Sequence, residues 1–408
     1  MNERDQRAYR DLRSSLEADG ADVEGIEERL RSQQVETPSW GYGNSGTRFR
    51  VFPQKGVPRT PFEKVEDAAE VHRHTGICPS VAIHIPWDRI DNMLEVRQHA
   101  ESLGMRIGAV NPNLFQEDEY RLGSVCNADS AIRRMATDHM IECVEIAKGV
   151  DSQLLSVWLA DGTNYPGQDS FVDRRSRMLG CLTEVYAAMP ATMRMLVEYK
   201  FFEPGFYHTD LSDWGTALLT CQKLGDRAQV LVDLGHHAQG TNVEHIVAIL
   251  LEEGRLGGFH FNNRKYADDD LLVGAINPFE LFLIYVELTR PSSGERSSAS
   301  PVAYMLDQSH NIEPKIEAMI VSVMNLQEMY AKALLVDRQR LVRAQQDGDV
   351  LGAHSVITAA YATDVRPMCA KVREDLGASA HPVSAFRDSG YLERVAATRV
   401  GGTQAGWN

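Results

Sequence analysis

Short runs rich in β-forming residues alternate with longer amphipathic runs along most of this chain. The pattern extends from about residue 38 to residue 335. Alternating strands and helices predict parallel strands joined by right-handed crossovers. The predicted strands are 38–44, 80–86, 106–112, 153–159, 193–199, 228–234, 257–263 and 302–308. Eight such units in a chain of this length predict an α/β fold of the closed (β/α)8 type, the TIM barrel.

Helical segments flank the predicted barrel. Residues 1–37 are highly charged and carry apolar residues three and four positions apart, which predicts an N-terminal helical extension. Residues 38–335 would form the barrel, which we expect to be the catalytic domain. Residues 312–346 have the pattern of one long helix or of two joined helices. The pattern of residues 336–408 predicts a C-terminal helical extension and tail.

The charge balance bears on the partners of the chain. With 42 basic and 57 acidic side chains, the formal net charge is −15. This argues against nucleic acid as a partner, because nucleic-acid binding needs a basic surface. The charged start and the shortness of the apolar runs predict neither a signal peptide nor a membrane span. The six cysteines are widely spaced with no CxxC pair, so we expect reduced thiols and a cytoplasmic location.

Four predicted strands in succession end in a side chain that can bind a metal ion. Glu198, Asp233, His260 and Asp307 each follow an apolar run. Because the active site of a (β/α)8 barrel lies at the carboxyl ends of its strands, we expect these side chains on one rim. Three carboxylates and one imidazole are typical of a site for Mn²⁺, Mg²⁺ or Co²⁺, whereas three anions without a cation would repel one another. The alternative is that they are separate, hydrogen-bonded residues at strand ends.

A second set of ligands lies close to the first in the sequence. His236 follows Asp233 after a glycine that allows a turn. Asp268 and Asp270 lie on one side of a predicted extended segment beyond the seventh strand. With Glu198 as a bridge, these residues could hold a second cation. Alternatively, the run of three aspartates is a solvated loop or a charge cluster at a helix N-terminus.

Lys200 and four aromatic residues complete the predicted site. Lys200 shares a strand face with Glu198, because residues two apart in a strand point the same way. Its ammonium could polarise a substrate oxygen, or it could form a salt bridge with a nearby carboxylate. The aromatic candidates are His84, Trp87, Phe115 and Trp158. They could form a wall that stacks on the C–H face of a sugar, although an isolated tryptophan is more often part of a core.

At these residues the sequence resembles the L-rhamnose isomerase family, in its xylose-isomerase-like branch. The matching stretches cover the barrel in order: IHIPWD (83–88), VNPNLFQ (110–116), VWLADGTNYPGQ (157–168), VEYKFFEP (197–204), VDLGHHAQGTNVE (232–244), GFHFNNRKYADDDL (258–271) and MLDQSHN (305–311). The chain departs from the family pattern at Asn263, where the family has an acidic residue, and at Arg264. Both departures bear on loop geometry and sugar preference.

The resemblance implies a metal-dependent aldose–ketose isomerase that interconverts L-rhamnose and L-rhamnulose, with D-allose and D-psicose as a further substrate pair. It implies two divalent metal ions per subunit, with Mn²⁺ expected and Co²⁺, Mg²⁺ or Zn²⁺ as alternatives. The structural ion would be held by Glu198, Asp233, His260 and Asp307. The catalytic ion would be held by Glu198, His236 and Asp268, with Asp270 near by.

The same resemblance implies substrate contacts and an assembly. The substrate-binding residues would be His84, Trp87, Phe115, Trp158 and Lys200. The family implies a homotetramer in which an aromatic residue of a neighbouring subunit closes the pocket, and Phe49 is the expected counterpart. The partner is then a small aldose or ketose, with no role for nucleic acid or membrane.

The expected reaction moves a hydrogen from C2 to C1 as hydride, with Lys200, Asp270 and Asp307 as catalytic residues. Lys200 would stabilise the carbonyl oxygen, while the two aspartates orient a water that shuttles a proton between the oxygens. The rival route is an ene-diol, in which a carboxylate takes the proton from C2. Two other functions remain open: a ketose 3-epimerase of the same fold, and a non-catalytic, metal-stabilised sugar-binding barrel.

Overall fold

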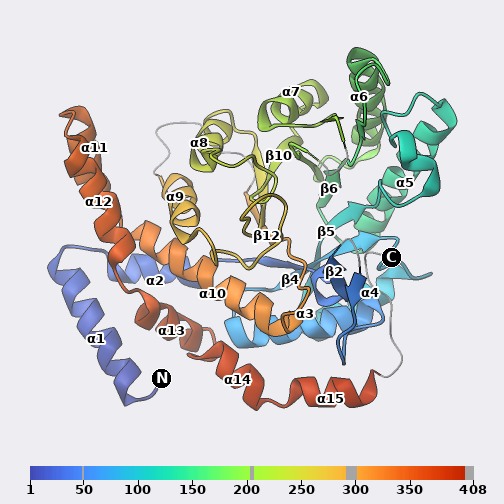
Figure 1. Ribbon diagram of the computed structural model, residues 1–408. Coiled ribbons are helices and arrows are strands. Elements are labelled where there is room, and N and C mark those ends of the chain that lie inside the picture. The colour runs from blue at the N-terminus through green and yellow to red at the C-terminus, as the bar shows by residue number, and fades with distance from the viewer. Residues whose placement is uncertain (48–49, 203–205, 291–300, 400–408) are drawn as a thin grey trace.

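A closed barrel of eight parallel strands lies at the centre of the computed structural model, which describes residues 1–47, 50–202, 206–290 and 301–399 (Figure 1). Around the barrel the strands are β1 (Glu36–Pro38), β4 (Ser80–Ile85), β5 (Arg106–Pro112), β6 (Leu154–Trp158), β8 (Arg194–Glu198), β10 (Ala228–Asp233), β11 (Leu256–Phe261) and β12 (Ala303–Leu306). This order is the order of the chain, so each strand pairs with the next, and β12 closes on β1. The prediction of a (β/α)8 barrel is confirmed.

Helices cover the outside of the barrel, one after each strand (Figure 1). They are α3 (Pro61–Thr75), α4 (Met93–Ser102), α5 (Ser130–Gly149), α6 (Phe171–Ala188), α7 (Trp214–Leu224), α8 (Val243–Glu252), α9 (Pro278–Leu288) and α10 (Lys315–Leu334). Their starts are set locally: Thr60, Ser170, Asp213 and Asn242 each accept a hydrogen bond from a backbone amide of the first turn. Strands such as β10 and β11 are buried at every residue, as expected where a parallel sheet is covered by helices.

The first strand differs from its prediction. Residues 38–44 were expected to be extended, but β1 ends at Pro38 and a 3-10 helix, η1 (Ser39–Tyr42), follows. Pro38 has no amide hydrogen with which to continue a strand ladder. Gly41 lies so close to helix α10 that an added Cβ would come 2.3 Å from Met319 Cε. The chain therefore turns early, and this turn places Trp40 at the mouth of the barrel.

The loops at the carboxyl ends of the strands carry small elements of their own. These are the paired strands β2 (Ser45–Thr47) and β3 (Arg50–Phe52), the paired strands β7 (Gly162–Thr163) and β9 (His208–Thr209), and the 3-10 helix η2 (Asp118–Leu122). The isolated bridge between Asn263 and Leu271 closes the loop after β11. These elements hold the loops around the site described below.

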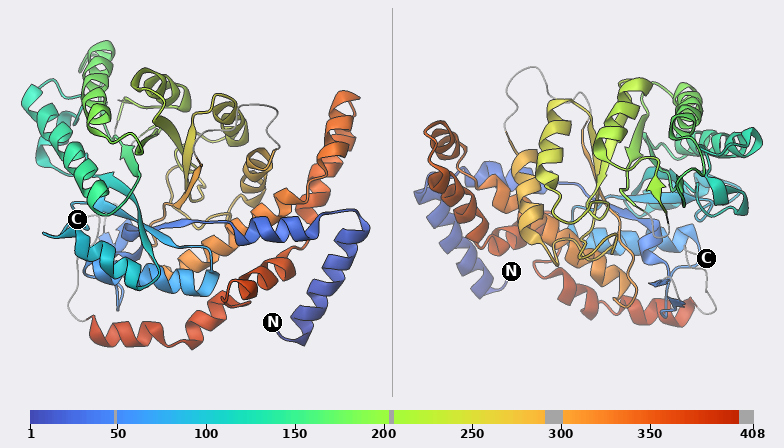
Figure 2. Two further views of the ribbon diagram at one scale, coloured as in Figure 1. Left: turned by 180° about the vertical axis from the view of Figure 1, so that it is seen from behind. Right: turned by 45° about the horizontal axis from the view of Figure 1, so that its top comes forward.

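Helices from both ends of the chain lie beside the barrel (Figure 2). They are α1 (Glu3–Ala18), α2 (Val23–Arg31), α11 (Arg338–Gln346), α12 (Val350–Ala362), α13 (Arg366–Asp375), α14 (Pro382–Asp388) and α15 (Tyr391–Thr398). Leu16 and Leu30 pack with Met368 and Val372 in a core separate from that of the barrel. Residues 312–346 form two helices, α10 and α11, which is the second of the two arrangements expected from the sequence.

The barrel interior is filled by a small apolar layer of Ala82, Ala109, Leu196, Leu231 and Met305. All six cysteines are buried and free, in line with the expectation of reduced thiols. Over the residues that the structure describes, no helix combines the length and the apolar character needed to cross a bilayer. The polar end of the barrel interior, above this apolar layer, is where the predicted site residues gather.

Candidate functional site

A pocket of about 170 Å³ lies at the carboxyl ends of the strands. It is lined by Trp40, His84, Trp87, Asn111, Pro112, Phe115, Ser156, Trp158, Glu198, Lys200, His236, His260, Asp268, Asp270 and Asp307. Residues from all eight strands or the loops that follow them therefore converge on one space. Asp233 lies beside this space as a buried ligand candidate, and Phe49 lies outside the described residues. All the other residues predicted from the sequence line the pocket.

The first predicted ligand set forms one cluster. Atoms of Glu198, Asp233, His260 and Asp307 that could bind a metal ion all lie within 4.8 Å of one another. His260 Nδ1 is 3.2 Å from Glu198 Oε1, 3.4 Å from Asp307 Oδ2 and 3.9 Å from Asp233 Oδ2. The register explains the proximity, because Asp233 is paired with His260 across β10 and β11. Parallel pairing in a closed barrel thus brings four distant residues to a single point.

The second predicted set adjoins the first at His236. Ligand atoms of Asp233, His236 and Asp268 lie within 4.8 Å of one another, so Asp233 joins this cluster, while Glu198 Oε1 lies 3.3 Å from His236 Nδ1. The same Nδ1 lies 3.0 Å from the carbonyl oxygen of Tyr199, and His236 Nε2 lies 3.3 Å from Asp268 Oδ1. With its Nδ1 hydrogen on that carbonyl, a neutral His236 can offer the Nε2 lone pair to a metal ion, the arrangement common for metal-binding histidines. Gly235 makes the turn possible, since an added Cβ would come 3.0 Å from Asp268 Oδ1 and 3.1 Å from Asp233 Oδ1.

The run of three aspartates divides into two roles. Asp269 is a structural residue, because its Oδ2 accepts hydrogen bonds from the backbone amides of Lys265 and Tyr266. Asp268 and Asp270 line the pocket instead. Asp270 has a φ of 48°, in the left-handed region, so the segment is not the simple extended one expected from the sequence. The alternative of a fully solvated acidic loop is wrong for Asp268 and Asp270.

Electrostatics at the site reflect crowded, buried carboxylates. Burial, with neighbouring carboxylates acting in the same direction, raises the pKa of Asp233 to about 7 and that of Asp270 well above its ordinary value. Burial opposes charge on His236 and His260, but the carboxylates around them outweigh it and raise their pKa values to about 10 and about 9. The shifts of the two histidines show that the surroundings of the cluster favour positive charge.

These residues fit a divalent cation. His260 Nδ1 is buried and makes no hydrogen bond of normal geometry within the described part of the chain, although carboxylate oxygens surround it. A buried ring nitrogen in that state is costly unless it meets a ligand. Carboxylate oxygens with one imidazole per cluster are the donors that Mn²⁺, Mg²⁺ and Co²⁺ accept.

Lys200 is both ion-paired and exposed to the pocket. Its Nζ lies 2.7 Å from Asp268 Oδ2 and 5.2 Å from the centre of the Trp158 ring. The structure therefore contains the salt bridge that was one of the two alternatives predicted for Lys200. The ammonium nevertheless lines the cavity beside the two acidic clusters, where it can also reach a bound molecule.

The aromatic residues form a continuous wall. His84 and Trp87 stack with ring centres 3.9 Å apart, and Phe115 and Trp158 meet edge to face at 4.9 Å. His84 Nδ1 and Trp158 Nε1 are buried and make no hydrogen bond to other described residues. Burial keeps the pKa of His84 well below its ordinary value, so its imidazole is neutral. The wall thus offers an apolar face with two polar atoms available for a ligand.

Trp40 is the functional candidate that sequence reasoning missed. It lines the pocket next to His84, with the two rings edge to face at 5.6 Å. Its indole Nε1 donates a hydrogen bond of 2.7 Å to Asp307 Oδ1. The sequence did not indicate that Trp40 would line the pocket and bond to Asp307. That contact forms only because β1 closes the barrel against β12. Ser156 also lines the pocket and carried no sequence signal, whereas Asn111, which lines it too, lies at the end of a predicted strand.

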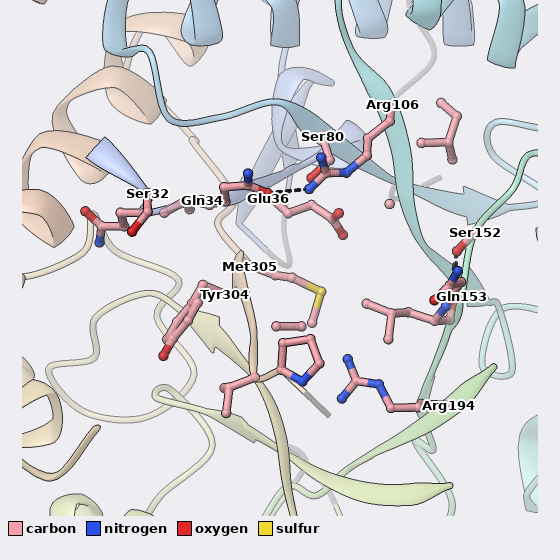
Figure 3. A pocket seen from close by; sticks show the side chains of 18 of the residues that line it. Ser32, Gln34, Glu36, Ser80, Arg106, Ser152, Gln153, Arg194, Tyr304 and Met305 are labelled. Carbon is pink, nitrogen blue, oxygen red and sulfur yellow. Dashed lines mark hydrogen bonds between the residues drawn. The ribbon is translucent and has the colours of Figure 1, made fainter. Parts of the chain in front are cut away.

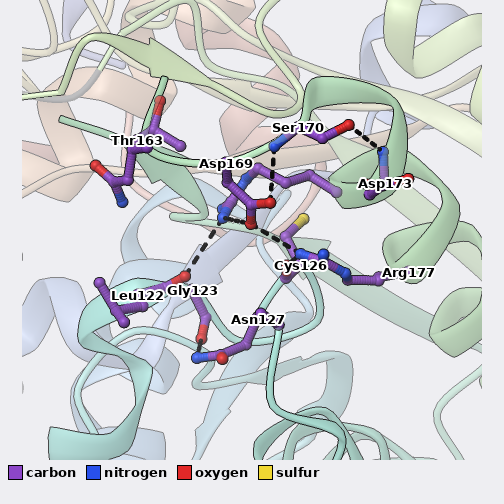
Figure 4. A network of polar contacts seen from close by, with 12 residues as sticks. Leu122, Gly123, Cys126, Asn127, Thr163, Asp169, Ser170, Asp173 and Arg177 are labelled. Atoms are coloured by element: carbon purple, nitrogen blue, oxygen red, sulfur yellow. Dashed lines mark hydrogen bonds and ion pairs between the residues drawn. The ribbon is translucent and has the colours of Figure 1, made fainter. Parts of the chain in front are cut away.

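A further buried cluster beside the pocket is structural. Cys126, Asp161 and Asp210 could also surround an ion, yet the carboxylates already have partners. Asp161 accepts hydrogen bonds from the amides of Ser124 and Cys126, and Asp210 binds Arg174. Figure 4 shows the adjoining part of this network, in which Asp169 bonds to Arg177 and to the amide of Ser170. The network ties together the loops that follow β5, β6 and β8.

Two probable sugar isomerases match this sequence over nearly its whole length. The sequence is 43% identical to a probable sugar isomerase of Rhizobium meliloti (strain 1021), over 96% of this chain and 92% of that protein. A probable sugar isomerase of Mesorhizobium japonicum (strain LMG 29417 / CECT 9101 / MAFF 303099) is also 43% identical, over 97% of this chain and 92% of that protein. The chain belongs to this sugar isomerase family. No protein-family model matches it.

Two solved epimerase structures share the fold of this sugar isomerase. An L-ribulose 3-epimerase superposes with a TM-score of 0.53 at 12% identity, over 78% of this chain and 98% of its own. A D-psicose 3-epimerase solved in the presence of D-fructose gives a TM-score of 0.52 at 11% identity, over 75% and 99%. At such identity the likeness shows the shared barrel fold alone.

Proposed function

We propose that the protein is a metal-dependent aldose–ketose isomerase of the L-rhamnose isomerase type. The natural reaction would interconvert L-rhamnose and L-rhamnulose, with D-allose and D-psicose as a further pair. The observation that carries the proposal is the convergence of two adjoining carboxylate–imidazole clusters with Lys200 and an aromatic wall on one pocket. The family of probable sugar isomerases supports the same conclusion.

Two divalent ions, with Mn²⁺ the expected metal, would occupy the two clusters. Glu198, Asp233, His260 and Asp307 would hold one ion. Glu198, His236 and Asp268 would hold the other, with Asp270 beside it. When bound, such ions supply Lewis-acid stabilisation of negative charge on sugar oxygens.

The side chains around the ions would bind and orient the sugar. The rings of Trp87, Phe115 and Trp158 would stack on its C–H groups and exclude water from the reacting carbons. The unpaired Nδ1 of His84 and Nε1 of Trp158 would hydrogen-bond to its hydroxyl groups. These contacts hold C1 and C2 in a fixed orientation, which lowers the entropic part of the barrier.

Three side chains would act during the transfer itself. Lys200 would place its ammonium against the carbonyl oxygen as negative charge grows there. Asp270 and Asp307 would orient the water that passes a proton between O2 and O1. The carbon-bound hydrogen would pass from C2 to C1 as hydride within this water-poor pocket.

The assembly and location complete the proposal. The protein would act as a homotetramer in the cytoplasm, and Phe49 of a neighbouring subunit would cover the pocket. This follows from the resemblance to L-rhamnose isomerases.

The experiment is a product assay with the metal-treated protein. L-Rhamnose is incubated with Mn²⁺-loaded protein, and the products are identified by ¹³C NMR. A ketose that forms with Mn²⁺, is lost on adding EDTA and returns with Mn²⁺ or Co²⁺ is the expected result. D-Psicose is supplied in a parallel incubation, and its inversion at C3 without any conversion of the aldose would identify an epimerase instead. Binding without any product would identify a sugar-binding barrel.

A variant tests the role of Asp307, and isotope labelling distinguishes the two reaction routes. Asp307→Asn should keep the fold and lose most turnover, whereas Asp138→Asn, at an exposed site on α5, should keep full activity. Substrate labelled with deuterium at C2 should retain the label at C1 if hydrogen moves as hydride. Loss of the label to water would instead support the ene-diol route.

A further inference from the structure

A second, larger cavity lies at the opposite end of the barrel. Its volume is about 1050 Å³, and its walls come from residues at or near the amino-terminal ends of strands, including Glu36, Ser80, Arg106 and Arg194. Figure 3 shows these side chains around the space, with Tyr304 and Met305 on the side formed by β12. In a parallel barrel these ends face away from the carboxyl ends. Of the described residues, none lines both this cavity and the sugar pocket.

Two arginines enter the cavity with neutral partners. Arg106, at the start of β5, donates a hydrogen bond of 2.7 Å to Gln34 Oε1. Arg194, at the start of β8, donates to Gln229 Oε1 at 2.6 Å, and Figure 3 shows its guanidinium directed into the space. Neither guanidinium forms an ion pair with a carboxylate in the part of the chain that the structure describes. Most of their donors are therefore available, in a chain whose net charge is −15.

Acidic groups near these arginines are engaged elsewhere. Asp151 pairs with Arg97 at 3.5 Å, and Asp226 pairs with Arg255 at 3.0 Å. Glu36 is turned into the wall, where its Oε1 accepts a hydrogen bond of 2.9 Å from the Ala109 amide. Burial raises the pKa of Glu36, whereas the Ala109 amide and Arg106 act in the opposite direction. These three carboxylates also line the cavity, but among the described residues none of them forms an ion pair with Arg106 or Arg194.

We infer that this cavity is a binding site for a phosphorylated small molecule of the size of a sugar phosphate. Arginine forks match phosphate oxygens in geometry and charge. The amides of Gln34 and Gln153 and the hydroxyl of Ser152 line the same space and can bond to sugar hydroxyl groups. A cavity of about 1050 Å³ is much larger than a free phosphate ion needs, so the occupant carries more than its phosphate group. This inference does not depend on the proposed isomerase reaction.

Site-resolved protection tests the inference on the full-length, Mn²⁺-loaded protein. Phenylglyoxal modifies accessible arginines, and peptide mass spectrometry reports each position. D-Fructose 6-phosphate should slow modification of Arg106 and Arg194 severalfold, whereas D-fructose should not. Since no arginine is among the described residues that line the sugar pocket, binding there cannot produce this protection. Protection by inorganic phosphate at equal concentration would overturn the assignment of a sugar-sized ligand.

Calorimetric titration with D-fructose 6-phosphate supplies the second readout. Arg106→Met/Arg194→Met should weaken binding by about tenfold or more, because it removes two charge-assisted contacts. Arg194→Lys should retain part of the affinity, and Arg340→Met, on the exterior helix α11, should retain all of it. Should the double variant fail to fold, Arg106→Met alone changes an exposed residue and carries the test. Unchanged affinity in these variants, or no binding to the unmodified protein, would overturn the inference.

Discussion

Trp40 Nε1 donates a hydrogen bond of 2.7 Å to Asp307 Oδ1, which joins the start of the barrel to its last strand. The two residues are 267 positions apart in the chain. The contact uses one oxygen of the carboxylate and leaves Oδ2 directed at His260, 3.4 Å from its Nδ1. Trp40 therefore orients a carboxylate of the proposed metal site and contributes to the wall of the pocket at the same time.

Trp40→Phe should lower catalytic efficiency without unfolding the protein. Phenylalanine keeps an aromatic ring in the wall but loses the hydrogen bond to Asp307, a contact worth about 0.5–1.5 kcal/mol. We expect kcat/KM to fall by up to about tenfold, together with weaker Mn²⁺ binding, both measured on the purified variant. Trp214→Phe, on the exterior helix α7, is the control and should leave both quantities unchanged. Normal activity in Trp40→Phe would show that Asp307 is held by other contacts.

Lys200→Met should reduce kcat far more than it changes substrate binding. The ammonium faces the pocket, and Lys200 is the one lysine or arginine among the described residues that line it. Loss of one such electrostatic donor typically costs about 10²–10³-fold in rate. Steady-state kinetics with the aldose would measure the effect, and Lys148→Met, on the surface of α5, is the control. A kcat within about twofold of the unmodified enzyme would contradict the role given to Lys200.

Arg174→Met should destabilise the fold. Arg174 is 1% exposed, and its guanidinium bonds to both oxygens of Asp210 and to the Gly162 carbonyl. Removing it leaves Asp210 buried without its cation, a change that costs about 3–5 kcal/mol. Urea unfolding followed by circular dichroism would measure the loss. Arg134→Met removes an exposed pair with Glu184 and should cost no more than about 1 kcal/mol.

Acid should destabilise the protein in part through His310. Burial lowers the pKa of His310 to about 4, from an ordinary value near 6.5. Between those values the unfolded chain binds a proton that the folded protein excludes. The stability is therefore present above pH 6.5 and is lost as the pH falls toward 4.

The measurement is the free energy of unfolding at pH 7 and pH 5. His310→Gln removes the titrating group, so the difference between the two values should become smaller in this variant. His354→Gln changes an exposed histidine on α12 and should retain the original difference. If His310→Gln shows the same difference in unfolding free energy between pH 7 and pH 5 as the unmodified protein, other groups cause the acid sensitivity.

Local patterns predicted most of the barrel. The strands from β4 to β12 that form it begin and end close to their predicted positions, because buried parallel strands are near-continuous apolar runs between helices. The prediction failed at residues 38–44, where Pro38 ends the ladder and close packing of Gly41 against α10 redirects the chain. This early turn decides the position of Trp40, which explains why no periodicity could have indicated its role.

Local sequence patterns also predicted only part of the candidate site. Glu198, Asp233, His260 and Asp307 were predictable, since each follows a strand and the rule that strand ends meet at one rim needs no coordinates. The run at 268–270 was ambiguous, because only the folded loop shows that Asp269 binds backbone amides while its neighbours face the pocket. Lys200 was predicted as a site residue, but its ion-pair partner required the structure, since Asp268 is 68 positions away.

By itself the sequence determined the eight strand–helix units and the chemical identity of the side chain that ends each strand. These properties depend on neighbouring residues, through the periods of strand and helix and through caps such as Thr60 and Asp213. Only the tertiary structure decided the contact of Trp40 with Asp307, the division of labour among the aspartates and the arginine-lined cavity at the other end. Each of these joins residues from different units, and their distances follow from barrel closure and side-chain packing, which no local pattern encodes.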